Sequence, residues 1–162
     1  MNIVLHQPEI PHNTGAIGRT CLVTGAKLHL IRPYGFYLDE KSLKRAGMDY
    51  WHKIHVCEYD NFAHFMDSIS GGGASCPSHV SPRIHLIETA GDKIYTNVKY
   101  NPNDYIIFGS ETAGLPASLL SEYPGRIAAI PMTVDMRSLN LSVAVGIVLY
   151  EALRQNGFPG LQ

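Results

Sequence analysis

The sequence is poor in cysteine, in net charge and in long apolar runs, and each shortage excludes a class of protein. Its three cysteines, Cys21, Cys57 and Cys76, are odd in number and widely spaced, which argues against a disulfide framework or a zinc knuckle. No segment approaches the roughly 18 uninterrupted apolar residues of a membrane span, so we expect no membrane partner. A net charge of −1 argues against a protein whose whole surface binds nucleic acid.

Common motifs of nucleotide and hydrolase chemistry are also missing. The segment NTGAIGR (13–19) is not G-x-G-x-x-G, and GSETAGLP (109–116) lacks the Lys of a P-loop. Neither G-x-S-x-G nor H-E-x-x-H occurs, and the eight histidines are scattered. A kinase, an NTPase, a usual dehydrogenase and a metal hydrolase are therefore disfavoured, and we expect no metal site.

What is present suits one globular domain over residues 1–162, because the length allows a sizeable core and 45% of the residues are hydrophobic. The beginning, MNIVLHQPEIP, lacks the basic region of a signal peptide, so a cytoplasmic location is expected. The best candidate for a local basic patch is Lys41, Lys44 and Arg45 followed by Lys53, with His52 and His55 nearby, and a solvated helix face is the alternative for these residues. The segment SGGGASCPSHVSP (70–82) has low complexity and predicts a surface loop.

Strand and helix patterns alternate along the whole length. This alternation predicts an α/β fold with a mostly parallel sheet of five or six strands and helices on both faces. Asn13 or Thr14 is a candidate cap for a first helix that ends at Thr24. We expect strands at residues 2–6, 27–31, 53–58, 83–88, 105–108 and 127–130, and further helices at 39–46, 59–69, 116–122 and after Asn140.

Three polar segments follow predicted strands: residues 13–20, 109–116 and 132–139. The third leads directly into an apolar helical pattern for which Asn140 or Ser142 is a candidate cap and Gly157 a terminator. Open α/β sheets bind their ligands at the carboxyl ends of strands. The three segments are therefore predicted to form the functional site.

Taken together and in this order, the segments resemble the three motifs of the SPOUT class of S-adenosylmethionine-dependent RNA methyltransferases. NTGAIGRT is similar to the first motif, IIFGSETAGLP to the second and IPMTVDMRSLNLSVAVGIVLYEA to the third. The segments LHQPEIPHNTGAIGRT, GFYLDEKSLKRAGMDYW and RQNGFPG resemble more narrowly the members without an extension, which methylate the 2′-hydroxyl of tRNA nucleotide 34.

The resemblance implies a C-terminal deep trefoil knot, over about residues 84–155, and a homodimer whose active sites draw on both subunits. It also implies S-adenosylmethionine as cofactor, bound in a bent conformation among three knot loops, and no metal. The residues that match the cofactor-binding positions are Ile87, Glu88, Thr89, Gly91, Gly109, Glu111, Gly114, Ile130, Met132, Ser138 and Leu139.

Five polar residues match the catalytic positions of the class: Asn13, Arg19, Glu111, Ser138 and Asn140. Methyl transfer to a ribose hydroxyl requires alignment of oxygen, carbon and sulfur and the uptake of one proton. A guanidinium does not readily lose its proton, so we assign Arg19 the role of a phosphate or hydroxyl anchor. Simple helix capping is the alternative for Asn13 and Asn140, and a helix N-terminal carboxylate for Glu111.

The expected substrate is the anticodon stem-loop of certain tRNAs, methylated at the ribose of cytidine or uridine 34. One alternative keeps the chemistry and moves it to ribosomal RNA, although the relatives that act there usually carry an RNA-binding extension. Another is a non-catalytic RNA-binding protein that retains the cofactor.

Overall fold

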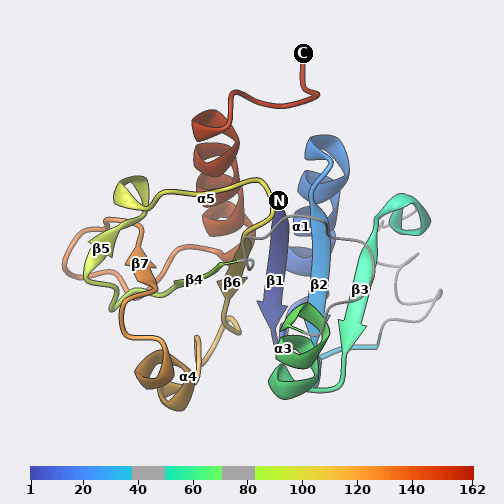
Figure 1. The fold of residues 1–162 in the computed structure, drawn as a ribbon. Coiled ribbons are helices and arrows are strands. Elements are labelled where there is room, and N and C mark those ends of the chain that lie inside the picture. Colours follow the sequence, from blue (N-terminus) through green and yellow to red (C-terminus); the bar gives the residue numbers. More distant parts are fainter. Residues whose placement is uncertain (38–49, 71–82) are drawn as a thin grey trace.

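A computed structural model describes residues 1–37, 50–70 and 83–162. Within these ranges seven strands form one sheet in the order β3-β2-β1-β6-β4-β7-β5, and every neighbouring pair is parallel (Figure 1). The parallel α/β prediction is therefore confirmed. The strands are β1 (Asn2–His6), β2 (Lys27–Ile31), β3 (Val56–Tyr59), β4 (Ile84–Ile87), β5 (Lys93–Ile94), β6 (Tyr105–Phe108) and β7 (Ile127–Ala129).

Helices cover both faces of this sheet. Those described are α1 (Pro11–Thr24), α3 (Phe62–Ser70), α4 (Ala117–Glu122) and α5 (Leu141–Gln155), with short 3-10 turns η1 (Trp51–Lys53) and η2 (Tyr95–Asn97). In the described parts of the chain, no helix is long and apolar enough to cross a membrane.

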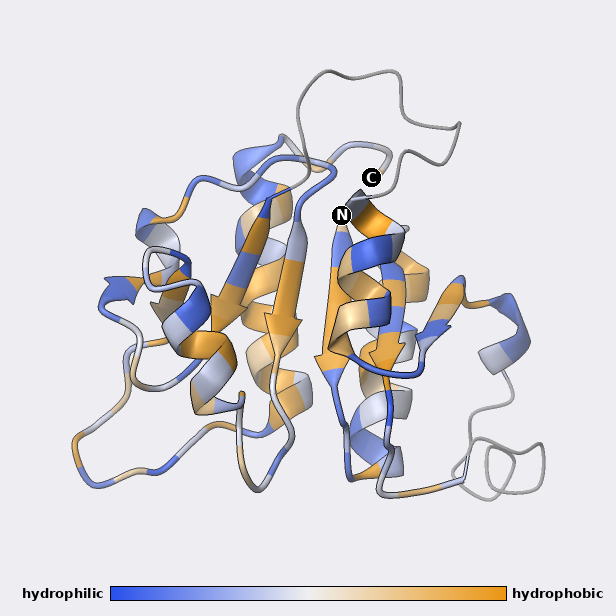
Figure 2. Ribbon diagram, turned by 60° about the horizontal axis from the view of Figure 1, so that its bottom comes forward, coloured by the Kyte–Doolittle hydropathy of each residue, from blue (hydrophilic) through white to orange (hydrophobic). Residues whose placement is uncertain are grey.

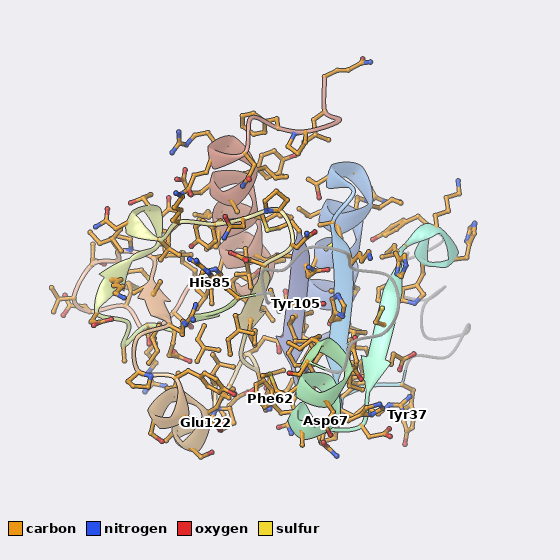
Figure 3. All side chains as sticks on the ribbon, in the orientation of Figure 1. Tyr37, Phe62, Asp67, His85, Tyr105 and Glu122 are labelled. Carbon is orange, nitrogen blue, oxygen red and sulfur yellow. The ribbon has the colours of Figure 1, made fainter. Side chains whose placement is uncertain are left out.

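The core has two layers because successive residues of a strand point to opposite faces. On β1, Ile3 and Leu5 pack with α1 and α5, whereas Val4 packs with α3 and α4. Figure 2 shows the resulting apolar strands enclosed between the helices. In Figure 3 the second face is marked by α3, with Phe62, and by α4, with Glu122.

The order of the strands reverses between β1 and β6, and this reversal positions the site. On one side of β1 lie β2 and then β3. On its other side the sheet continues with β6, β4, β7 and β5. Connections leaving β1 and β6 therefore diverge and open a crevice at the carboxyl ends of the strands.

Several boundaries differ from the predictions. The described residues form seven strands rather than five or six, and the additional strand, β5, is only two residues long and carries no apolar alternation by which it could be predicted. Helix α1 begins at Pro11, where proline is favoured, so neither Asn13 nor Thr14 is its cap. Strand β3 begins at Val56 rather than at Lys53, because residues 51–53 form η1, and α3 begins at Phe62.

Other expectations are confirmed. Cys21 is fully buried, and Asn140 caps α5 by accepting the backbone N–H of Ser142 at 2.9 Å. Gly157 follows the end of α5 with a positive φ of 71°. The predicted helix at 39–46, the basic-patch residues Lys41, Lys44 and Arg45, and most of the loop at 70–82 lie outside the described residues, whereas Lys53 of the patch ends η1.

Candidate functional site

A cavity of about 670 Å³ lies at the carboxyl ends of the strands. Its volume falls within the range of small-molecule sites. The exits of β4, β6 and β7 and the beginnings of α1 and α5 contribute its wall: Ile10, Asn13, Ile87, Glu88, Thr89, Phe108, Gly109, Ser110, Glu111, Thr112, Ala113, Gly114, Ile130, Met132, Arg137, Ser138, Leu139, Asn140, Leu141 and Ala144.

The structure brings together all of the predicted site residues except Arg19 and Gly91. Segments that are more than 100 residues apart in sequence, such as Asn13 and Asn140, thus meet at one cavity. The predicted convergence of the strand exits on one cavity is therefore observed.

Glycines allow the strand exits to approach one another closely. A side chain on Gly109 would overlap the backbone of Gly114, with which Ser110 forms two backbone hydrogen bonds of 3.0 and 3.2 Å. Gly91 lies outside the cavity wall, and a Cβ there would approach the carbonyl carbon of Ala128 to 2.5 Å. Gly91 therefore allows close packing behind the wall.

Glu111 is bound to the N-terminus of a helix from a distant part of the chain. Its carboxylate accepts the backbone N–H groups of Glu9 (2.8 Å) and Ile10 (3.2 Å) and the side-chain amide of Asn13 (2.9 Å). Ile10 is the N-cap residue of α1 and has no side chain able to cap it. Glu111 supplies the missing cap from the β6–α4 loop, where the helix dipole also favours its charge.

Asn13 joins this carboxylate to the third motif. While Nδ2 of Asn13 donates to Glu111, its Oδ1 accepts Nδ2 of Asn140 at 2.9 Å. The oxygen of Asn140 is in turn occupied by Ser142, whose Oγ donates at 2.6 Å. These bonds fix both amide orientations, and each amide keeps one further N–H donor for a ligand.

Arg19 lies on α1, and its guanidinium stacks at 4.4 Å from the ring centroid of Tyr50. The hydroxyl of Tyr50 donates to the carbonyl of Gly15 at 3.0 Å, which ties the ring to the same helix. Gly18, which precedes Arg19, leaves room for Ile54 and Trp51, since a Cβ at position 18 would come within 2.6 Å of Ile54 Cδ1. Arg19 is therefore held by a packed aromatic segment.

Glu88 connects the exit of β4 to the exit of β6. Its Oε1 accepts the backbone N–H of Thr89 (2.8 Å) and the hydroxyl of Thr89 (3.1 Å). Its Oε2 accepts the N–H of Leu115 at 2.9 Å. The carboxylate therefore fixes the relative position of two walls of the cavity.

The sequence interpretation missed one such connection, between Glu9 and Thr112. The carboxylate of Glu9 accepts both the backbone N–H (3.1 Å) and the hydroxyl of Thr112. Glu9 lies in the segment HQPEIP, but no regular pattern marks it as a partner of a residue a hundred positions away. The residues that form this contact belong to loops, where sequence periodicity carries no information.

The cavity wall combines backbone and apolar surface with a few charges. Ile87, Ile130 and Leu139 supply an apolar part suited to a flat ring, and the glycine-bearing turn at 109–114 exposes backbone groups. The charged residues of the wall, within the described ranges, are Glu88, Glu111 and Arg137. Such a cavity suits a nucleoside that carries a charged chain.

The model of the SpoU rRNA methylase family matches residues 1–150. The chain belongs to this family. Among curated relatives, the tRNA (cytidine(34)-2′-O)-methyltransferase of Yersinia pestis is 45% identical over 161 residues, which cover 99% of this chain and 96% of the relative.

Solved structures with the same fold include two at 27% identity or more. One, described as giving insight into the 2′-OH methylation of C/U34 on tRNA, has a TM-score of 0.84 at 40% identity. The match covers 96% of this chain and 95% of the chain in that structure. An rRNA methyltransferase from Sinorhizobium meliloti, solved with AdoMet bound, has a TM-score of 0.75 at 27% identity. That match covers 94% of this chain but only 55% of the relative.

Proposed function

We propose that this protein transfers a methyl group from S-adenosylmethionine to the 2′-hydroxyl of the nucleotide at position 34 of tRNA. The observation that carries the proposal is the single cavity formed by the three motif segments. Nearly full-length similarity to tRNA (cytidine(34)-2′-O)-methyltransferases supports the substrate. The apolar surface of Ile87 and Ile130 and the exposed backbone at Gly109 fit an adenosine, which is the flat part of that cofactor.

In the proposed reaction an oxygen–carbon bond forms as a carbon–sulfur bond breaks, and the hydroxyl proton leaves. When bound, S-adenosylmethionine supplies an activated methyl group, so the protein mainly has to align the hydroxyl. The free amide hydrogens of Asn13 and Asn140 are suited to hold the ribose. Because three donors already occupy Glu111, we assign it the positioning of α1 and assign the proton to solvent or an RNA phosphate.

A homodimer is part of this proposal. Arg19 is absent from the cavity wall, and α1 and α5, which pack together, expose the apolar side chains Val23 (60% exposed), Val143 (49%) and Tyr150 (47%). Association through this surface would bury them and bring Arg19 of a second copy to the cavity as an anchor for the anticodon stem-loop. We also propose the trefoil knot over about residues 84–155 of the single domain, and a cytoplasmic location alongside the tRNA.

Subunit complementation tests the shared site. Arg19→Ala and Asn140→Asp should each have little activity alone. In a mixed dimer one of the two sites has both native residues, so re-equilibrated equal mixtures should recover about a quarter of the native activity. Complete failure to recover, with mixed dimers detected by mass spectrometry, would contradict a shared site.

Methyl transfer from labelled cofactor tests the function itself. Unmodified tRNA should become labelled at the ribose of nucleotide 34, and a matched tRNA with 2′-deoxyribose at that position should not. Transfer to ribosomal RNA alone would show that ribosomal RNA, and not tRNA, is the substrate. Cofactor binding without transfer to either RNA would refute an enzyme and favour a non-catalytic binding protein.

A further inference from the structure

We infer that Glu88 is a specificity-determining residue that makes the cavity prefer the cationic methyl donor over its neutral demethylated product. The inference rests on the proposed cofactor. Donor and product have the same adenosine and amino acid parts and differ at the sulfur, which is a positively charged sulfonium before transfer and an uncharged thioether afterwards. A charge in the cavity wall is therefore the simplest means of distinguishing them.

The charge of Glu88 is oriented but not neutralised. Its two oxygens accept hydrogen bonds from Thr89 N, Thr89 Oγ1 and Leu115 N, and all three donors are uncharged. Among the described residues no Lys, Arg or His forms an ion pair with it. Glu88 is half-buried in the wall, where bulk water screens a charge less than at an open surface.

Glu111, the other carboxylate of the wall, is different. It accepts two backbone N–H groups at the N-terminus of α1, where the helix presents partial positive charge. The cationic residue of the wall within the described ranges is Arg137, which is exposed. Two carboxylates against one guanidinium leave the wall with a net charge of −1, and Glu88 is the member with the least compensation.

The surrounding backbone is shaped to hold this carboxylate. Gly114 has a φ of 67°, and a Cβ there would lie 2.5 Å from Oε2 of Glu88. A side chain at position 114 would therefore displace the carboxylate from its place between two cavity walls. The loop keeps both the conformation and the space that Glu88 needs.

A wall of this sign also assists turnover. Each transfer converts a cationic ligand into a neutral one, so the attraction to Glu88 is lost with the methyl group. Separations of a few ångströms beyond contact, in partly screened surroundings, give a preference of about three- to tenfold for the donor. Product then exchanges more readily for fresh donor.

Isothermal titration calorimetry with S-adenosylmethionine and S-adenosylhomocysteine, in the absence of RNA, tests the inference. In Glu88→Gln the ratio of the product Kd to the donor Kd should fall about three- to tenfold. Thr89→Val is the matched control, because it removes one hydrogen bond to the carboxylate while keeping the charge. Its ratio should equal that of the native protein even if both Kd values rise.

Equal weakening of both ligands in Glu88→Gln, or no change in either, would overturn the inference and leave the proposed function intact. If the native protein bound neither ligand, the proposed cofactor and the inference would fall together. Should Glu88→Gln not fold, the native protein provides the test, because salt weakens the attraction between Glu88 and the sulfonium, a charge that only the donor carries. Its Kd ratio should fall as ionic strength rises, and a constant ratio would overturn the inference.

Discussion

Two networks of polar side chains lie near opposite ends of the sheet. One is centred on a buried carboxylate, whereas the other lines the cavity. Near the amino ends of the strands, Asp104 accepts His85 Nε2 at 2.8 Å and two donors of Asn101, and it is 2% exposed. His85 lies on β4 (Figure 3). At the carboxyl ends, Glu111, Asn13 and Asn140 are linked in a similar way, but all three line the cavity.

The two networks serve different purposes, one the stability of the fold and the other the binding of a ligand. The first network is closed, since its central residues Asp104 and His85 are both buried, so loss of one of them leaves buried polar atoms without partners. The open network retains N–H donors at a cavity, so loss of a member should alter what the cavity binds. Similar residue types thus serve different purposes, and the solvent exposure of the network decides which.

The largest effect expected is on stability, from Asp104→Ala. This change leaves His85 and the N–H groups of Arg83 and Asn101 without their buried acceptor. We expect the free energy of unfolding in urea to fall by about 4 kcal/mol. The exposed Asp92→Ala control should change it by less than about 0.5 kcal/mol. Equal effects of the two variants would remove the distinction between a buried network and a surface charge.

Asn140→Asp should act in the opposite way. An aspartate keeps the oxygen that caps α5, so the free energy of unfolding should fall much less than in Asp104→Ala. It loses the amide N–H groups, one of which donates to Asn13, and kcat/KM for tRNA should fall about 100-fold, or roughly 3 kcal/mol. Native activity in this variant would reduce Asn140 to a helix cap.

Acidification tests a buried histidine outside these two networks, His29. Burial lowers the pKa of this imidazole to about 4, and its ring nitrogens meet Tyr59 Oη (2.9 Å) and Asn2 Oδ1 (3.3 Å). Because the unfolded chain binds the proton more tightly, stability is fully present above the ordinary pKa and declines as the pH falls toward 4. We expect a loss of about 2 kcal/mol between about pH 7 and pH 5.

Burial also lowers the pKa of His6 and of His85, so both residues also contribute to the loss of stability as the pH falls. The measurement is urea unfolding at several pH values. His29→Leu should flatten the dependence, whereas the exposed His52→Ala should leave its slope unchanged. An unchanged slope in His29→Leu would show that the buried imidazole does not produce the effect.

Tyr50 should give the smallest effect. Tyr50→Leu removes the ring on which Arg19 stacks, a contact worth about 1 kcal/mol, and we expect KM for tRNA to rise about fivefold while cofactor Kd stays constant. Tyr50→Phe keeps the ring and loses only the hydroxyl bonded to Gly15, so its KM should stay near the native value. Equal KM values for Leu and Phe would argue against positioning of Arg19 by stacking.

The sequence predicted the elements with strong local signals and missed those set by distant contacts. Apolar periodicity identified β1, β2 and β6 with the bounds that the structure has, and residue type gave Asn140 or Ser142 as the cap of α5, of which the structure selects Asn140. It missed β5, whose two residues pair with β7 and carry no local pattern of their own.

The candidate site shows the same division. The motifs identified most of the cavity wall, but not how its residues are connected. Asn13 resembled a helix cap because asparagine favours that position, whereas it actually bridges Glu111 and Asn140. A partner 98 or 127 residues away leaves no trace in local pattern, and the same holds for Glu9 and Thr112.

A crystal structure of the protein with S-adenosylmethionine tests the central claim most directly. The account predicts the adenosine between Ile87, Gly109 and Ile130, and the methyl group directed toward Asn13 and Asn140. Density for the cofactor at the amino ends of the strands, or anywhere outside the cavity at 109–114 and 130–141, would contradict it.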